Sequence, residues 1–149
     1  MLIQWSDRFA TGHALVDQQH QALFGAIQDF DLAVTGAGEP EAIQRTLAFL
    51  ASYTRDHFAT EEGLMMRCAF PGLALHAQEH ANLNLRVQFI TRLWETDPAR
   101  VSLGGLSRFL SEWWSNHIQV WDAEIFTYLR EKPLPVPGIL PSGPTLLGI

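Results

Sequence analysis

Four short patterns of histidine and carboxylate side chains could do chemistry in this sequence. They are His20, His57-x3-Glu61, His76-x3-His80 and His117-x4-Asp122, and they contain five of the six histidines. Residues four apart on a helix lie on one face, so the two middle patterns each predict a chelating pair. Their seven nitrogen and oxygen ligands exceed the four that one zinc ion usually takes. They indicate two ions with larger coordination numbers, iron or manganese, bridged by carboxylates.

Each of these residues has a simpler interpretation when it is considered alone. A buried histidine is most often hydrogen-bonded within the core of a protein. Several of the seven, however, fall at positions that hydrophobic residues occupy elsewhere in the same helical repeats. Because each buried ionisable group without a partner would cost several kcal/mol, their convergence favours metal binding.

Two other metal motifs are excluded by spacing. In His76-Ala-Gln-Glu-His80, Glu79 stands at the wrong offset for a zinc protease, which needs His-Glu-x-x-His. Ferritin-like di-iron oxidases use Glu-x-x-His, and no histidine in this chain has a glutamate three residues before it. A ligand set rich in histidine and poor in carboxylates is more typical of reversible dioxygen binding than of oxidase chemistry.

Asp122 lies five residues beyond His117, which makes this pattern the weakest of the four. On a regular α-helix that offset places it about 140° round the axis and about 7.5 Å further along. We therefore expect the carboxylate to swing in from the flank rather than to sit beneath the histidine.

Hydrophobic periodicity predicts the helices that must position these residues. The first is expected from about Asp17, as its N-cap, to Val34. Two more are expected at about 40–67 and 73–96, and a fourth is expected to end near Arg130. Short connections force neighbouring helices to run antiparallel. The sequence thus predicts an all-α protein, an up-down-up-down antiparallel four-helix bundle with an N-terminal arm and a proline-rich C-terminal tail.

The expected domain organisation is a bundle at 1–132 and a tail at 133–149. Within the first part, residues 1–16 form an arm that carries Trp5 and Phe9 against the body. The tail holds five prolines and no charged side chain. Because its apolar residues would otherwise be exposed, we expect it to lie along the bundle or a neighbouring chain, so that its removal lowers thermal stability or changes the oligomeric state.

Composition excludes several classes of protein. The chain has 149 residues, of which 47% are hydrophobic and 17% charged, as expected for one globular domain. Its formal charge of −6 argues against nucleic acid or an anionic membrane surface as a partner. The lone Cys68 excludes an intrachain disulfide and a thiolate metal site. Neither a signal peptide nor a run of ~18 apolar residues is present, so we expect no membrane insertion and a cytoplasmic location.

The motifs resemble those of the bacterial hemerythrins over about residues 3–130. The resemblance is carried by four segments, which read Asp17-Gln-Gln-His20-Gln-Ala-Leu-Phe24, His57-Phe-Ala-Thr-Glu61-Glu62, His76-x3-His80 and Trp113-Trp-Ser-Asn-His117-Ile118-x3-Asp122. It implies two iron ions, one held by His76, His80 and His117 and the other by His20 and His57. Glu61 and Asp122 would bridge them together with an oxo or hydroxo group.

The same resemblance implies reversible dioxygen binding for storage, delivery or sensing, at an open position on the two-histidine iron. A dry pocket wall would be formed by Phe24, Phe58, Trp113, Trp114 and Ile118. Trp114 departs from the family, where leucine is usual. We expect its larger indole to narrow the entry path to the iron, although it could instead fill a gap between helices.

No general acid or base is apparent beyond the ligands, so the protein is interpreted as a carrier and not as an enzyme. The alternatives are a di-iron peroxidase, a nitric-oxide-handling enzyme and an iron storage protein. Sensing or delivery would require an oxygen-using or signalling partner protein. His13, Tyr53, Glu62 and Cys68 are expected to have no role as metal ligands.

Overall fold

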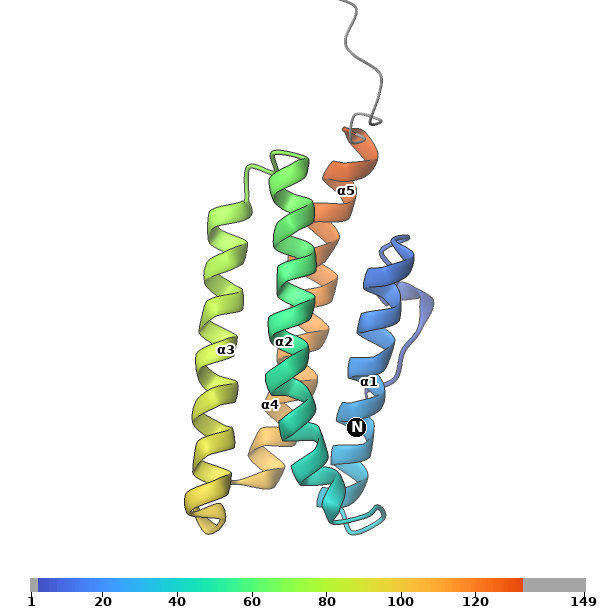
Figure 1. Ribbon diagram of the computed structural model, residues 1–149. Coiled ribbons are helices and arrows are strands. Elements are labelled where there is room, and N and C mark those ends of the chain that lie inside the picture. The colour runs from blue at the N-terminus through green and yellow to red at the C-terminus, as the bar shows by residue number, and fades with distance from the viewer. Residues whose placement is uncertain (1–2, 133–149) are drawn as a thin grey trace, which may run out of the picture.

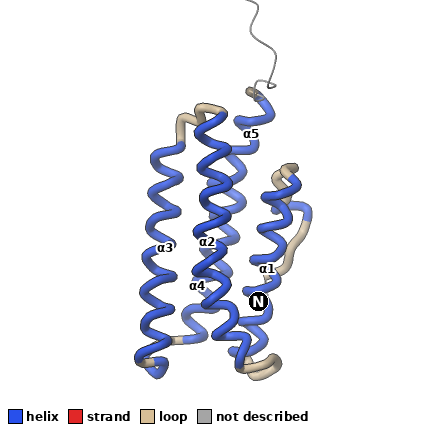
Figure 2. The backbone as a smooth tube through the Cα atoms, viewed as in Figure 1, coloured by secondary structure: helices blue, strands red, loops and turns tan. Residues whose placement is uncertain are grey.

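The computed structural model describes residues 3–132, and these form an antiparallel bundle of long helices (Figure 1). Its long helices are α1 (Ala14–Val34), α2 (Glu41–Arg67), α3 (Leu73–Thr96) and α4 (Leu103–Asn116), and the short α5 (Ala123–Glu131) prolongs α4. Short loops join successive helices at alternate ends of the bundle (Figure 2). This up-down-up-down arrangement confirms the predicted fold class. The predicted tail at 133–149 lies outside the described residues.

The helix ends follow local sequence signals, with one correction. The predictions for α2 and α3 are confirmed to within a residue. The prediction that Asp17 caps α1 is wrong, because the helix starts at Ala14 and His13 is its N-cap, with its Nδ1 accepting from the backbone N–H of Val16. Asp17 instead accepts hydrogen bonds from the backbone and hydroxyl of Thr11, which orders the turn before the helix. Sequence alone did not distinguish these two uses of a polar side chain near a helix start.

The predicted fourth helix is interrupted in the middle. Between α4 and α5 the backbone forms a π-helical turn, His117–Asp122, in which hydrogen bonds span five residues instead of four. The backbone N–H of Ala123, for example, donates to the carbonyl oxygen of Ile118. The α-helical periodicity of the sequence continues on both sides of this turn, which explains why a single helix was predicted.

Two apolar layers are stacked along the bundle with a polar layer between them. The larger apolar cluster includes Leu23, Leu50, Leu83 and Leu110, and the smaller includes Val16, Leu64, Met65, Ile125 and Phe126. On α1 and α2, and where α4 passes into α5, the ligands of the four patterns lie at the junction of these two sets in sequence. On α3 the partly buried Leu73 takes the place of the smaller cluster. The hydrophobic effect of the two layers therefore fixes the helices on both sides of the polar layer.

The N-terminal segment packs against α1. A short 3-10 helix, Asp7–Phe9, positions Phe9 with its ring centroid 4.6 Å from that of Phe24. The ring of Trp5 meets the same Phe24 edge-on at 5.7 Å. These contacts bring Trp5 to 6.5 Å from the ring of His20, so the arm covers one side of the polar layer. Within residues 3–132, no helix is long and apolar enough to cross a membrane.

Candidate metal centre

The structure brings all seven predicted ligands together at the centre of the bundle. Each of these side chains is at most 1% exposed. Their ligand atoms form two overlapping groups, each with all atoms within 4.8 Å of one another. The three-histidine half comprises His76, His80, His117, Glu61 and Asp122, and the two-histidine half comprises His20, His57, Glu61 and Asp122. The two halves share both carboxylates.

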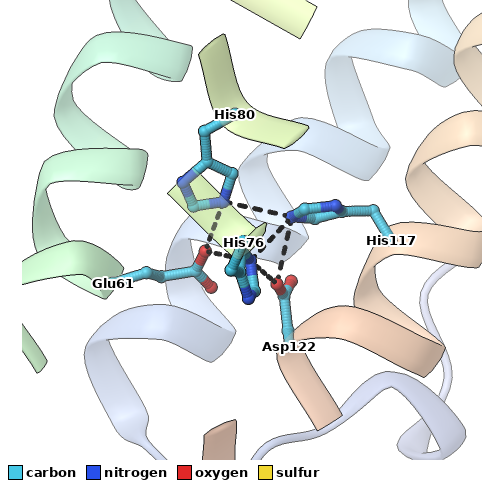
Figure 3. A group of neighbouring side chains, drawn as sticks. All are labelled: Glu61, His76, His80, His117 and Asp122. Atoms are coloured by element: carbon cyan, nitrogen blue, oxygen red, sulfur yellow. Dashed lines mark hydrogen bonds and ion pairs between the residues drawn. The ribbon is translucent and has the colours of Figure 1, made fainter. Parts of the chain in front are cut away.

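Glu61 faces both halves because it lies one turn after His57 on α2. Its Oε1 is 3.4 Å from Nε2 of His57, within the two-histidine half. Its Oε2 is 3.3 Å from Nε2 of His80, within the three-histidine half. Figure 3 shows the carboxylate of Glu61 pointing across the bundle toward the histidines of α3. One carboxylate thus presents a separate oxygen to each half.

Asp122 divides its oxygens in the same way. Its Oδ1 lies 3.1 Å from Nε2 of His117 and 3.2 Å from Nε2 of His76 (Figure 3). Its Oδ2 lies 3.2 Å from Nε2 of His20, in the other half. The expectation that Asp122 enters from the flank is wrong in its geometry. In the π-helical turn, residues five apart come close to the same face, so His117 and Asp122 point to one centre.

The chemistry of this donor set fits a pair of metal ions. No oxygen of Glu61 or Asp122 has a hydrogen-bond partner among residues 3–132, although both carboxylates are fully buried. The Nε2 atoms of His20 and His57 lie 3.2 Å apart, and so do those of His80 and His117. Buried lone pairs that point at one another need cations between them, because unpaired buried charge is costly. Imidazole nitrogens and carboxylate oxygens together suit iron.

Burial keeps the imidazoles in the neutral form that binds metals. Desolvation, followed by the neighbouring histidines, lowers the pKa of His57 to about 3 and that of His80 to about 2. Burial likewise raises the pKa of Glu61 well above its ordinary value, and the neighbouring Asp122 adds to this. Burial would raise the pKa of Asp122 too, but His117, His20 and His76 together outweigh it and hold that pKa well below the ordinary value. Neutral imidazoles beside the buried carboxyl groups of Glu61 and Asp122 form a site that favours bound cations.

Two further residues orient the ligands, and the sequence prediction missed both. Nδ1 of His57 lies 2.9 Å from Oε1 of Gln19, and Nδ1 of His80 lies 2.9 Å from Oε1 of Glu62. An oxygen acceptor places the imidazole proton on Nδ1, which leaves the Nε2 lone pair facing the cluster. Glu62 is partly exposed, and its carboxylate pairs with Nδ1 of His80. The available signal was position, since each residue is adjacent in sequence to a ligand.

The residues predicted to form a dioxygen pocket lie at different distances from the ligand histidines. Phe58 stacks on His80 with ring centroids 3.7 Å apart, and Trp113 stacks on His117 at 4.4 Å. Trp114 is fully buried, 6.3 Å from the ring of His57 and 6.0 Å from that of His117. Phe24 and Ile118 are both 2% exposed and belong to the larger apolar cluster.

Three residues that were expected to have no ligand role lie outside both groups of ligand atoms. His13 caps α1 and its ring is 6.0 Å from that of Phe126. Cys68 lies at the end of α2, where its thiol contacts the carbonyl oxygen of Met65. Tyr53 is buried with its ring stacked on His57, with the centroids 4.9 Å apart.

Comparison with known proteins gives consistent matches over most of the chain. A family model described as the hemerythrin HHE cation-binding domain matches residues 11–129. The chain is 31% identical to a bacteriohemerythrin of Ralstonia nicotianae, over 88% of this chain and 91% of the relative. It is also 31% identical to a myohemerythrin of Riftia pachyptila, over 77% and 83%. A crystal structure of a hemerythrin mutant with tyrosine in place of a leucine is similar with a TM-score of 0.75 and 28% identity, covering 86% of this chain and 97% of that one.

Proposed function

The chain belongs to the hemerythrin family, and we propose that it binds dioxygen reversibly at two iron ions held by the seven buried ligands. By this assignment one iron would be held by His76, His80 and His117, and the other by His20 and His57. Glu61 and Asp122 would bridge them, together with an oxo or hydroxo group.

The observation that carries the proposal is the division of the two carboxylates between the halves. Each of Glu61 and Asp122 presents one oxygen to the two-histidine half and the other to the three-histidine half. In a site for one ion, both carboxylates would direct their oxygens to the same group of histidines. Two bridging carboxylates between two groups of imidazoles support a di-iron centre in particular.

A pair of ferrous ions supplies, when bound, the two electrons that dioxygen accepts on binding and returns on release. The protein's part is to hold and enclose the site. The two-histidine half has one histidine fewer than the other, so its ion would have one coordination position open to a small ligand. Gln19 and Glu62 hold the rings of His57 and His80 in the orientation that keeps Nε2 toward the cluster.

Exclusion of water would favour reversible binding over oxidation. Trp114, Phe58 and Ile118 are buried around the cluster, at 0%, 2% and 2% exposure. Water and protons that reach such a site promote loss of the bound oxygen in reduced form, so a dry wall suits a carrier. Phe24 and the half-buried Trp113 complete the pocket that we assign to dioxygen.

Members of the hemerythrin family are oxygen carriers rather than enzymes. We propose the same for this chain, with storage, delivery or sensing as the physiological role. Delivery or sensing would involve an oxygen-using or signalling partner protein in the cytoplasm. A peroxidase would be expected to place an acid or base beside the ligands. Nitric oxide handling and iron storage would each give a different result in the experiment below.

The experiment is anaerobic loading of the purified full chain with ferrous iron, followed by exposure to air and then to vacuum. We expect two irons per chain and a visible absorption that appears with dioxygen and disappears on its removal over several cycles. Turnover of hydrogen peroxide or nitric oxide at a useful rate would favour an enzyme instead. Uptake of many irons per chain would favour storage, and a single tightly bound ion would contradict the proposed centre.

A further inference from the structure

Tyr53 carries a buried hydroxyl that the packing of the bundle does not explain. It lies one turn before His57 on α2, and its side chain is only 7% exposed. The hydroxyl oxygen is buried and has no hydrogen-bond partner within residues 3–132. Buried hydroxyls are normally paired, so an unpaired one next to a ligand site indicates a partner that binds from outside.

The three aromatic rings around Tyr53 offer no acceptor for this hydroxyl. Its ring lies 5.2 Å from that of Phe49, 5.6 Å from that of Trp114 and 4.9 Å from that of His57. Phe49 has no polar atom and an indole can only donate. The nitrogens of His57 are already committed, since Nδ1 pairs with Gln19 and Nε2 faces the cluster.

A second unpaired donor lies against the same histidine. The indole Nε1 of Trp114 is buried and also has no partner in the described part of the chain. The rings of Tyr53 and Trp114 meet edge-on, and both contact His57. Around the three-histidine half, by contrast, the ring stacked on His80 is that of Phe58, which has no donor. Tyr53 thus places an unpaired donor beside the two-histidine half, and Trp114, with its ring 6.3 Å from that of His57 and 6.0 Å from that of His117, places another beside both halves.

We propose that Tyr53 is a ligand-stabilising residue whose hydroxyl donates a hydrogen bond to dioxygen, or to a small anion such as azide, bound beside His57. This inference rests on the proposed function, because it assumes that the ligand occupies the two-histidine half. Trp114 forms the adjoining wall and contributes the second donor. The pocket would then be polar at one edge and apolar elsewhere, which suits a ligand that gains negative charge on binding.

A phenol O–H can donate the hydrogen bond that this proposal requires. A net hydrogen bond of ordinary strength corresponds to about a fivefold to tenfold change in a dissociation constant.

The test is Tyr53→Phe in the full chain, which removes the hydroxyl and keeps the ring. We expect two irons per chain as in the wild type, with dioxygen dissociation by stopped flow about fivefold to tenfold faster and azide bound correspondingly more weakly. The O–O stretching frequency of the oxygenated protein, measured by resonance Raman spectroscopy, should shift. The metal-free variant should unfold at the same temperature as the metal-free wild type or higher, because no internal hydrogen bond is lost.

Tyr128→Phe is the matched control, since Tyr128 is the other of the two tyrosines. Its hydroxyl donates to the carbonyl oxygen of Ala69 near the end of the bundle. We expect this variant to leave dioxygen dissociation and azide affinity unchanged, and to lower the unfolding temperature slightly.

Three outcomes would overturn the inference. One is dissociation and azide affinity in Tyr53→Phe within twofold of the wild type, and another is loss of iron, which would mean that the hydroxyl serves a metal ligand. The third is a lower unfolding temperature of the metal-free variant, which would indicate an internal partner. Failure of the wild type to bind dioxygen would count against the proposed function, and azide affinity would still decide the role of Tyr53.

Discussion

The two halves of the buried cluster are built from the same residue types but are enclosed differently. The three-histidine half is covered by rings that stack closely on its ligands, Phe58 on His80 and Trp113 on His117. The two-histidine half is bordered by Tyr53, and Trp114 lies beside both halves. The hydroxyl of Tyr53 and the indole N–H of Trp114 are buried and unpaired within residues 3–132. By the proposed function, the first half would hold an ion, whereas the second would hold an ion and admit a small ligand.

The orienting residues differ as well. His80 is held by a carboxylate, that of Glu62, and His57 by an amide, that of Gln19. A carboxylate makes the histidine that bonds to it a stronger electron donor than an amide does. We therefore expect tighter metal binding in the three-histidine half, and the following predictions test this difference in order of decreasing effect.

Removal of a bridging carboxylate should affect both halves at once. Glu61→Ala takes one oxygen from each half, so we expect iron content to fall from two per chain to nearly none, and dioxygen binding to be lost. His57→Ala is the contrasting variant, because it leaves the three-histidine half intact and should retain about one iron. Metal analysis after desalting measures both. If Glu61→Ala kept one firmly bound iron, the two halves would be more independent than their shared carboxylates imply.

Removal of the metal should lower the stability of the whole bundle. Without cations the metal-facing atoms of Glu61 and Asp122 stay buried and unpaired, and removing the partner of a buried charge costs about 3–5 kcal/mol. Thermal or urea unfolding of metal-free and iron-loaded protein measures this difference in the free energy of unfolding. Calcium in place of iron is a suitable control, since it disfavours imidazole ligands and should restore little of the loss. Equal stability with and without iron would contradict the view that the metals compensate the polar layer.

The orienting residues should tune each half separately. Glu62→Gln weakens the hydrogen bond that orients His80, and Gln19→Leu removes the one that orients His57. Loss of such a partner typically reduces metal affinity about 10–100-fold. We expect Glu62→Gln to release iron faster from the three-histidine half and Gln19→Leu to release it from the two-histidine half. The rate of iron transfer to a chelator, followed in the visible spectrum, separates the two. Identical release from both variants would mean that the halves exchange iron as one unit.

The smallest expected effect is on the rate of ligand entry. Trp114→Leu should speed association of dioxygen and azide severalfold if the indole, 6.3 Å from the ring of His57 and 6.0 Å from that of His117, narrows the approach to the site. Trp121→Leu is the control, since Trp121 contacts His76 in the other half. Both variants should cost roughly 1–3 kcal/mol or less in stability. Unchanged association in a correctly metallated Trp114→Leu would identify Trp114 as packing alone.

Much of the arrangement follows from local sequence. The pairs His57–Glu61 and His76–His80 converge because residues four apart share one helix face, and that spacing is visible in the sequence. The apolar repeat on either side of each pair predicts which face is buried, and hence a bundle with a polar layer at its centre. The resemblance of the same residues to the hemerythrin motifs added iron as the expected metal and dioxygen as the expected bound molecule.

Only the tertiary structure revealed the features that depend on a departure from regular α-helix or on contacts between helices. The π-helical turn that aligns His117 with Asp122 has no clear sequence signal, because one extra residue in a helical turn leaves the periodicity on each side unchanged. Gln19 and Glu62 were overlooked because their roles depend on reaching a histidine of another helix. The same holds for Tyr53, whose burial against His57 and Trp114 is a property of packing. Local periodicity fixes which side chains point inward, but only the relative rotation of the helices determines which inward side chains meet.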